Sequence, residues 1–213
     1  MNRAKYLVCA FILITPISVS PKPSLKFLIA AEEGDIQAIR KAIAKKTNIN
    51  IRDKHGDTAL MWAAQKGRVD AVKILIDANA NLDLKNHDGW SALMAATTAQ
   101  QGEVVSLLLQ AGADVNTSLK SGWTVLMVAA AAGLTDMVRI LIEANADVNA
   151  VGHGDFTAMI AASQAGHAEI VRLLIAAKAD VNQVNKAGYT ALMIAKEKRH
   201  LEVAVILENA GAN

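Results

Sequence analysis

The 213-residue sequence has one cysteine, Cys9, three prolines, and aromatic side chains at only 4% of its positions. A chain with a single cysteine cannot form an internal disulfide. Hydrophobic residues nevertheless make up 53% of the sequence, so the core has to be built from Ala, Leu, Ile, Val and Met. Such a composition favours helices that pack closely on small side chains.

The sequence also lacks an excess of charge of one sign. It carries 22 Lys and Arg residues against 20 Asp and Glu residues, and Arg3 and Lys5 account for the whole difference. The balanced chain has no extended basic run, so it lacks the electrostatic pattern of a nucleic-acid-binding protein. We therefore expect no nucleic acid among its partners.

Motifs for catalysis are absent as well. The sequence has no G-x-S-x-G nucleophile motif, no H-E-x-x-H zinc motif and no glycine-rich phosphate or dinucleotide loop. The five histidines are scattered, and scattered histidines in solvated loops do not converge on a metal by default. They are His55, His87, His153, His167 and His200. We expect a protein that is not an enzyme and that uses no cofactor and no metal.

The first 20 residues form a separate segment. Two basic residues precede an unbroken apolar run over residues 6–14. The run is shorter than the roughly 20 apolar residues that span a bilayer, and the pattern predicts a secretory signal peptide over residues 1–20. Cleavage after Ser20 is poorly favoured because Pro21 would follow the cut. An uncleaved N-terminal anchor is the main alternative, and an apolar start without a targeting role is the third. We expect an exported protein, periplasmic or secreted, with no other membrane segment.

Beyond this segment, the sequence repeats itself every 33 residues. A hydroxyl recurs before a short Ala-rich stretch and is placed to accept from a backbone N–H of the next helical turn, as an N-cap does. These hydroxyls belong to Thr58, Ser91, Thr124, Thr157 and Thr190. A leucine column at the same spacing predicts an amphipathic second helix. It consists of Leu75, Leu108, Leu141, Leu174 and Leu207. Asp- and Asn-rich segments ending in glycine predict a short hairpin loop between units.

The motifs in these units resemble those of ankyrin repeats. The hydroxyls lie in DTALMWAA, WSALMAAT, WTVLMVAA, FTAMIAAS and YTALMIAK, and segments such as ADVN follow the second helix. These stretches match the family patterns G-x-T-P-L-H-x-A-A and G-A-D-V-N. The resemblance covers residues 24–213 and implies an all-α solenoid of stacked helix pairs with short β-hairpin loops. It implies about six repeats, at residues 24–54, 55–87, 88–120, 121–153, 154–186 and 187–213. An array preceded by a signal peptide resembles exported bacterial ankyrin-repeat proteins.

Several positions depart from the family pattern. Methionine or isoleucine replaces the family's histidine, and we interpret this methionine column as core filling rather than a soft-metal site. The methionines are Met61, Met94, Met127 and Met193. Trp62 is also interpreted as a core residue. Gln100 replaces a turn glycine and Asp155 a hairpin glycine, which affects their loops rather than the fold. Polar residues in the last repeat, including Glu208 in an otherwise apolar column, predict a cap.

The candidate binding residues follow the same spacing. In the family, the residue before the repeated hydroxyl faces the concave groove, and here four of these residues are aromatic: Trp90, Trp123, Phe156 and Tyr189. Helices about 10 Å apart would hold the rings too far apart to stack, so we expect separate anchors for a partner. The alternative is that the rings only pack over neighbouring hairpins.

The loop tips and inner helices supply the remaining candidates. The tips lean basic and indicate an acidic surface on the partner, although a charged tip is commonly just solvated. The tip residues are Lys54, His55, His87, Lys120, His153 and Lys186. Groove positions on the inner helices are Gln65, Lys66, Gln164, Glu197 and Lys198.

Taken together, these features predict an exported, monomeric, non-catalytic module that binds a protein partner through the groove and the hairpin tips. Two alternatives stay open. The protein could be a secreted effector that binds host proteins, or an accessory subunit of a periplasmic enzyme or stress-defence system.

Overall fold

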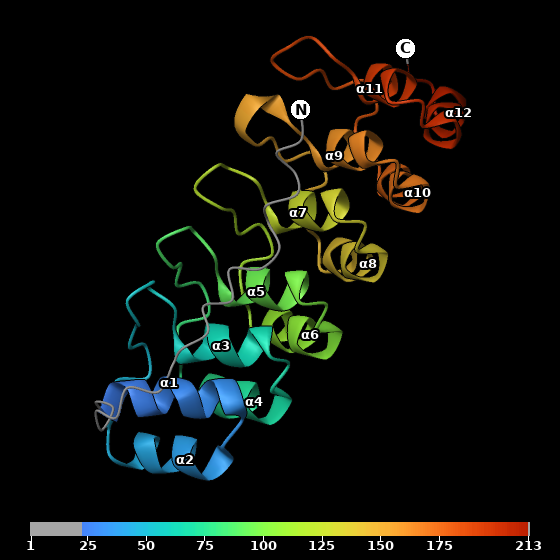
Figure 1. The fold of residues 1–213 in the computed structure, drawn as a ribbon. Helices are drawn as coiled ribbons and strands as arrows, with labels where there is room; N and C mark the ends of the chain where they lie inside the picture. Colours follow the sequence, from blue (N-terminus) through green and yellow to red (C-terminus); the bar gives the residue numbers. More distant parts are fainter. Residues whose placement is uncertain (1–22, 213) are drawn as a thin grey trace.

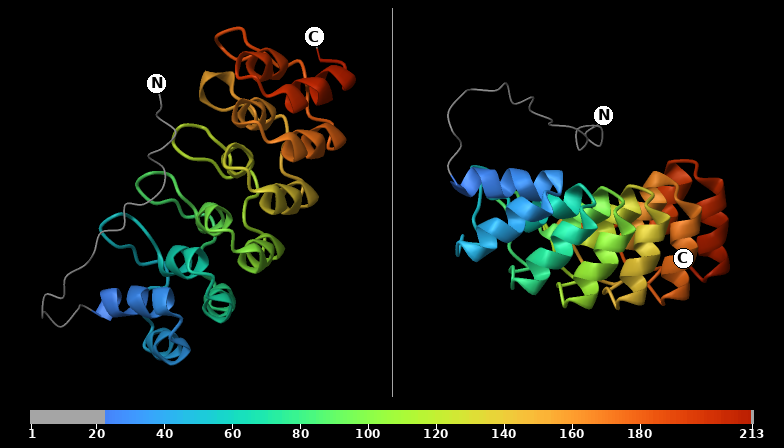
Figure 2. Two further views of the ribbon diagram at one scale, coloured as in Figure 1. Left: turned by 45° about the vertical axis from the view of Figure 1, so that its right-hand side comes forward. Right: turned by 90° about the horizontal axis from the view of Figure 1, so that it is seen from below.

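The computed structural model describes residues 23–212, which form twelve α-helices joined by turns and loops (Figure 1). The predicted signal peptide, residues 1–20, lies outside the described residues. Within residues 23–212, no helix has the length and apolar character needed to cross a membrane. The helices stack in one direction, and the described part of the chain is an elongated array (Figure 2).

Six helix pairs follow one another along this array. The inner helices are α1 (Pro23–Glu33), α3 (Ala59–Gln65), α5 (Ala92–Thr98), α7 (Val125–Ala131), α9 (Ala158–Ala165) and α11 (Ala191–Glu197). The outer helices are α2 (Ile36–Ala44), α4 (Val69–Asp77), α6 (Gly102–Gln110), α8 (Thr135–Glu143), α10 (Ala168–Ala176) and α12 (Leu201–Asn209). Each inner helix packs against the inner helices of neighbouring repeats, and each outer helix does the same in its own layer. The predicted solenoid of helix pairs is confirmed.

The repeated hydroxyls begin the inner helices as predicted. The Thr58 hydroxyl accepts a hydrogen bond from the backbone N–H of Met61 at 3.3 Å. The same bond, at 3.2–3.3 Å, is made by Ser91, Thr124, Thr157 and Thr190. Because the first N–H groups of a helix have no partner inside it, each hydroxyl satisfies a donor that would otherwise be unpaired. The outer helices begin without such a cap in α4, α6, α8, α10 and α12.

The turn inside each helix pair keeps its geometry even where glycine is replaced. Gln100 has a φ of +56°, close to the +65° of Gly67 at the same position of the preceding repeat. A residue with a side chain adopts this left-handed conformation at a cost of roughly 1–2 kcal/mol. The fold therefore imposes the turn on Gln100.

The loops project away from the helix layer and give each repeat an L-shaped outline (Figure 1). Extended pairing within residues 23–212 is limited to two isolated antiparallel bridges, Arg52 with Thr58 and Ser118 with Thr124. The fourth loop is different: it contains the short 3-10 helix η2 (His153–Asp155), in which Gly154 and Asp155 have φ values of +76° and +58°. The replacement of the hairpin glycine by Asp155 thus changes this loop locally, as the sequence indicated.

The core is a continuous apolar layer between the helix rows. The predicted leucine column is fully buried, at 0% exposure from Leu75 through to Leu207. Met61, Met94 and Met127 are buried as predicted, but Met193 is 49% exposed. The prediction was wrong for Met193 because the other methionines are covered by the following helix pair, and α11 and α12 form the last pair of the described residues.

Asp and Asn side chains connect neighbouring repeats in the segments that follow the C-terminal ends of the outer helices. The Asn50 side-chain oxygen accepts from the backbone N–H of Asn81 at 2.9 Å, and Asp83 accepts likewise from Asp114 at 2.9 Å. Two further bonds of 2.8 Å continue the series, from Asp147 N–H to Asn116 and from Asp180 N–H to Asn149. We call these four inter-repeat bonds the Asx ladder. The Asp and Asn side chains of the A-D-V-N motif and its equivalents therefore link neighbouring repeats by hydrogen bonds.

Candidate functional site

The candidate site is the surface that the inner helices and the projecting loops form together, which we call the groove face. Its floor consists of three positions of each inner helix, i, i+3 and i+4, which share one side of an α-helix. In α3 these are Trp62, Gln65 and Lys66, and in α11 they are Ile194, Glu197 and Lys198. The wall consists of the loops and carries the predicted aromatic residues and the predicted tips.

The middle of the floor has no charge. On α5, α7 and α9 and at their C-caps it consists of the partly or fully exposed Thr98, Ala99, Ala131, Ala132, Gln164 and Ala165, with the buried Ala95, Val128 and Ala161 beneath them. Short side chains of this kind leave an even surface on which another polypeptide can lie closely. Charged residues appear at its two ends, beside α3 and α11. The predicted groove residues Gln65 and Gln164 are exposed, as are Glu197 and Lys198, and Lys66 is half-buried.

The aromatic column lines the wall beside this floor. Trp90, Trp123 and Phe156 are half-buried against the core, and Tyr189 is 43% exposed. The ring of Trp123 stacks on that of Phe156, with centroids 5.9 Å apart and planes inclined by 26°. Our expectation that the rings lie too far apart to stack was wrong for this pair. The centroid distance is shorter than the interval of about 10 Å between helices on which that expectation rested.

Trp123 also packs over the backbone of the next loop. A Cβ atom at Gly152 would lie 3.4 Å from Trp123 Cδ1 and 3.1 Å from Met127 Sδ. Trp123 thus makes the contact with a neighbouring hairpin that the alternative role of the column describes. Trp90 and Tyr189 form no ring pair within residues 23–212.

Asp and Asn side chains set the shape of three of the loops. The Asn86 side-chain oxygen accepts from the backbone N–H of Trp90 at 2.9 Å, and Asn185 accepts from that of Tyr189 at 3.0 Å. Asp53 accepts from Asp57 in the same way, at 3.0 Å. An Asx side chain that bonds its own downstream backbone holds a turn in place. These bonds fix where the backbones of Trp90 and Tyr189 stand on the wall.

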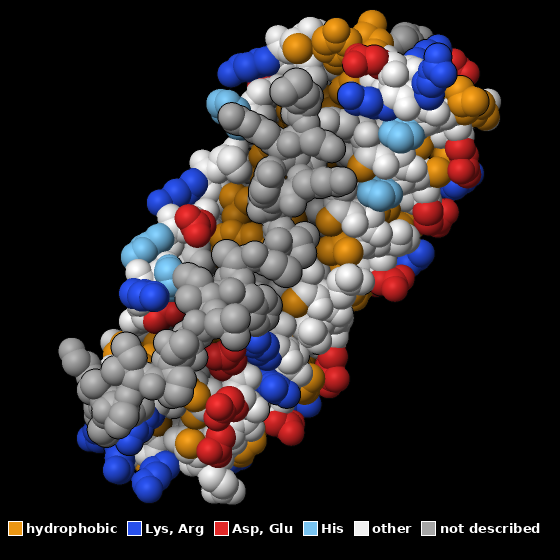
Figure 3. All heavy atoms as spheres, viewed as in Figure 1, with side chains coloured by type: hydrophobic (Ala, Val, Ile, Leu, Met, Phe, Trp, Pro, Cys, Tyr) orange, Lys and Arg blue, Asp and Glu red, His pale blue; other side chains and the backbone are white. Residues whose placement is uncertain are grey.

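The predicted tip residues form one exposed row. Lys54, His87, Lys120, His153 and Lys186 occupy the same position of five successive loops, and all five are exposed, as is His55 beside Lys54. Backbone hydrogen bonds join several neighbouring loops, for example from His87 N–H to His55 O at 3.0 Å and from Lys186 N–H to Gly154 O at 2.9 Å. In Figure 3, Lys, Arg and His side chains follow one another along the edge formed by the loops.

In the first loop, the position equivalent to the four aromatic residues is held by an acid, Asp57. The Asp57 carboxylate accepts a hydrogen bond of 2.7 Å from the Asn86 side-chain amide. Burial raises the pKa of Asp57 above its ordinary value of 3.8, and the neighbouring Asp53 carboxylate acts in the same direction. The Asn86 hydrogen bond favours the charged form and opposes the shift only in part. The first loop therefore carries a half-buried carboxyl where later loops carry rings.

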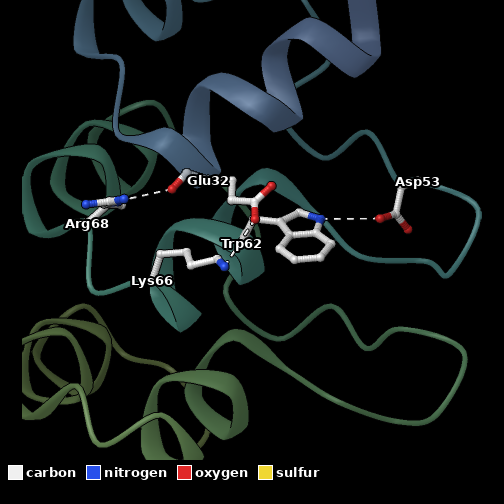
Figure 4. Close-up of polar contacts among 5 residues, drawn as sticks. All are labelled: Glu32, Asp53, Trp62, Lys66 and Arg68. Carbon is white, nitrogen blue, oxygen red and sulfur yellow. Dashed lines mark hydrogen bonds and ion pairs between the residues drawn. The ribbon is translucent and has the colours of Figure 1, made fainter. Parts of the chain in front are cut away.

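Trp62, which the sequence had led us to interpret as a core residue, adds a further aromatic side chain to the groove face. It is half-buried on α3, and its indole N–H donates to the Asp53 carboxylate at 3.2 Å (Figure 4). Nearby, Lys66 forms an ion pair of 3.2 Å with Glu32, and Arg68 Nε donates to the Glu32 backbone oxygen at 3.0 Å. The signal was available in the sequence, because Trp62 aligns with the variable position held by Ala95 and Val128.

Two of the five histidines lie away from the hairpin tips. His167 and His200 are half-buried at the starts of α10 and α12. A Cβ atom at Gly133 would lie 2.7 Å from His167 Cε1, so glycine leaves room for this ring against the preceding repeat. His200 Nε2 lies 3.2 Å from the Gln164 backbone oxygen. Residues 23–212 contain no group of three or more His, Cys, Asp or Glu side chains that could hold a metal ion.

Comparison with known proteins agrees with this architecture. A family model described as ankyrin repeats (3 copies) matches residues 27–119, 80–152 and 126–213. The crystal structure of an ankyrin repeat domain from Acinetobacter baumannii AYE is similar, with 33% sequence identity and a TM-score of 0.82. The match covers 88% of this chain and 98% of that one. A search of curated proteins gave no match. With the family model matching most of its length, the chain belongs to the ankyrin-repeat family.

Proposed function

We propose that this protein is an exported, non-catalytic module that binds one protein partner along the groove face. Ankyrin repeats are generally protein-interaction modules. The observation that supports the proposal is the contrast within the groove face. An uncharged floor of small residues on α5, α7 and α9 lies beside a wall that carries half-buried aromatic rings and a row of exposed basic tips. Apolar contact on the floor would provide affinity, and the tips would orient an acidic edge of the partner.

The roles of the aromatic residues divide in this proposal. Trp90 and Tyr189 are the rings that would contact the partner, because neither is used in a ring pair within the described residues. Trp123 and Phe156 support the wall by stacking on each other. Tryptophan and tyrosine are among the residue types enriched at binding hot spots.

A substitution on the floor tests the proposed binding mode. Ala165 is the exposed last residue of α9 on the groove face, and Ala176 is the exposed last residue of α10 in the outer layer. We would capture partners from the native compartment with the unaltered chain, with Ala165→Glu and with Ala176→Glu, and identify them by mass spectrometry. We expect Ala165→Glu to lose the partner and the matched control Ala176→Glu to retain it. Equal capture by both variants would contradict binding on the groove face.

Export is proposed from the sequence of residues 1–20. Fractionation of the native cell tests it, with the mass of the mature chain measured at the same time. We expect the protein in the periplasm or the medium, and a mass that reports whether the segment is removed. Recovery of the intact chain from the cytosol alone would contradict export.

A further inference from the structure

The edge of the array that the five projecting loops form carries side chains whose charge depends on pH. We call this surface the loop edge, and it comprises residues 52–57, 85–90, 118–123, 151–156 and 184–189. These residues include five Lys and Arg side chains, four aspartates and three histidines. While the histidines are neutral, the loop edge has a net charge of only +1, and protonation of all three raises it to +4. The histidines therefore determine whether this surface is nearly neutral or strongly cationic.

Two of these histidines alternate with lysines at one position of successive loops. All five side chains at this position are exposed, and their order along the array is Lys54, His87, Lys120, His153 and Lys186. The third histidine, His55, is exposed beside the first lysine. Histidine is the side chain that ordinarily changes its charge between pH 5 and 8. Because these rings are exposed to solvent, they can take up protons without a rearrangement of the fold.

Contacts between neighbouring loops make the loop edge one continuous surface. The backbone N–H groups of His87, His153 and Lys186 each donate to a backbone oxygen of the preceding loop, at 2.9–3.2 Å. The second and third loops also approach closely, since a Cβ atom at Gly89 would lie 2.7 Å from the Lys120 backbone nitrogen. Charges gained on separate loops can therefore act on the same bound segment.

Acidic side chains balance the basic ones while the histidines are neutral. Each histidine shares its loop with at least one aspartate, and these are Asp53 and Asp57 in the first loop, Asp88 in the second and Asp155 in the fourth. The basic side chains of the same and adjacent loops are Arg52, Lys54, Lys85, Lys120 and Lys186. Because these opposite charges nearly cancel, protonation of the histidines changes the charge of the whole surface.

We propose that the loop edge binds an acidic segment of the protein partner and that this contact tightens as the three histidines become protonated. The inference rests on the proposed function, in which the tips orient an acidic edge of the partner, and it adds pH as the condition that controls the contact. A single exposed ion pair stabilises a complex only slightly. Three new positive charges on one continuous surface act together, attracting an acidic segment and repelling a basic one.

Binding of poly-L-aspartate to the full chain tests the proposal, with the affinity measured by fluorescence polarisation of the labelled polymer. Aspartate carboxyl groups, with an ordinary pKa of about 3.9, stay charged between about pH 7.5 and 5.5, so a change over this range arises from the protein. We expect the dissociation constant to fall roughly tenfold from the higher pH to the lower one at about 0.05 M salt. The change should shrink as salt is added, because screening weakens interactions between exposed charges.

A triple variant identifies the groups responsible. We expect His55→Gln/His87→Gln/His153→Gln to lose most of the tenfold change, because the loop edge then has no imidazole to protonate. The variant keeps Asp57, whose pKa is raised by burial, so any part of the change that comes from this carboxyl remains.

The two histidines that lie away from the hairpin tips provide a matched control. Gln101 occupies the position of His167 and His200 in the second complete repeat, so the fold accepts glutamine there. We expect His167→Gln/His200→Gln to keep the full pH dependence of binding.

The reverse change supplies a permanent charge. Lysine occupies the position of His87 and His153 in the other three loops, so the fold accepts His87→Lys/His153→Lys. We expect this variant to bind poly-L-aspartate roughly fivefold more tightly than wild type at about pH 7.5, and to gain less affinity on acidification.

Several results would overturn the proposal. They are a wild-type chain that does not bind poly-L-aspartate or binds it equally at both pH values, and a change as large in the triple variant as in wild type. Loss of the change in His167→Gln/His200→Gln would overturn it as well. Failure of the proposed function is seen separately, in capture of the native partner, because Ala165→Glu alters the floor of the groove face and leaves the loop edge intact.

Discussion

The indole ring of Trp123 stacks on the phenyl ring of Phe156 in the next loop, with their centroids 5.9 Å apart. The two residues are 33 positions apart in the sequence, so the contact joins equivalent positions of successive repeats. It joins two neighbouring loops through two of the four aromatic candidates.

The ring pair should contribute a measurable coupling energy. In a double-mutant cycle with Trp123→Leu and Phe156→Leu, we expect a coupling of about 0.5–1.5 kcal/mol in the free energy of unfolding. Urea denaturation followed by circular dichroism measures it. The control is a cycle on Trp90 and Trp123, which have no ring contact and should couple by less than about 0.5 kcal/mol. Equal coupling in both cycles would show that the stacking contributes nothing specific.

Two buried hydroxyls should be unfavourable for stability. The side-chain oxygens of Thr97 and Ser163 are buried without a hydrogen-bond partner, and an unsatisfied buried polar group costs about 1–3 kcal/mol. Thr97→Val and Ser163→Ala should therefore raise the free energy of unfolding by up to about that amount. Thr98→Val is the control, because the Thr98 hydroxyl donates to the Met94 backbone oxygen at 2.9 Å. A loss of stability in Thr97→Val as large as in Thr98→Val would contradict this interpretation.

The Asx ladder should depend on its acceptor oxygens rather than on charge. Asp83→Ala removes the acceptor for the Asp114 backbone N–H and should cost about 0.5–1.5 kcal/mol. Asp83→Asn keeps an oxygen in place, as Asn50 does in the preceding repeat, and should retain most of the stability. The melting temperatures of the two variants distinguish these cases. If Asp83→Asn lost as much as Asp83→Ala, the charge would be the important feature.

The half-buried carboxyl of Asp57 should make stability depend on pH. Because burial raises the pKa of Asp57 in the folded chain, the folded state holds this proton more tightly than the unfolded state does. Its contribution is therefore most favourable at low pH, and it falls as the pH rises from the ordinary value of 3.8 through the raised folded value.

Asp57→Asn removes this ionisation and keeps an oxygen that can accept from Asn86. We expect the stability of the variant relative to wild type to increase as the pH is raised from 4 to 7, measured by urea denaturation at each pH. Asp88→Asn is the control in the neighbouring loop, at an exposed site. A relative stability of Asp57→Asn that did not change with pH would contradict the assigned cause.

The sequence was enough to predict the architecture because its period places the same side chain in the same environment in every repeat. The Thr58 cap and the Leu75 core position could be predicted for this reason, and even Gln100 adopts the turn of the glycine that it replaces. The errors occurred where a residue's surroundings differ from those of its equivalents. Met193 is exposed because no described helix pair covers it.

The site was harder to predict than the fold because its contacts depend on the length and direction of individual side chains, which the repeat period does not specify. The spacing of helices gave the wrong distance for Trp123 and Phe156, whose rings extend toward each other. Trp62 was assigned to the core because it was taken to stand at a consensus leucine position. Its indole nitrogen needs a hydrogen-bond acceptor, however, and Asp53 provides one at 3.2 Å. Comparing Trp62 with its equivalents Ala95 and Val128 would have indicated a variable position.

The Asx ladder has a consequence for how such an array can change in length. Each bond joins an acceptor to a backbone N–H 31 residues further along the chain, as from Asn50 to Asn81 and from Asn116 to Asp147. Inserting a single residue inside a helix pair would shift one partner past the other and break the bonds on that side. A duplicated block of 33 residues restores every partner. The ladder thus makes gene duplication of whole units tolerable and small insertions within them costly, which accounts for a period kept without variation from Thr58 to Thr190.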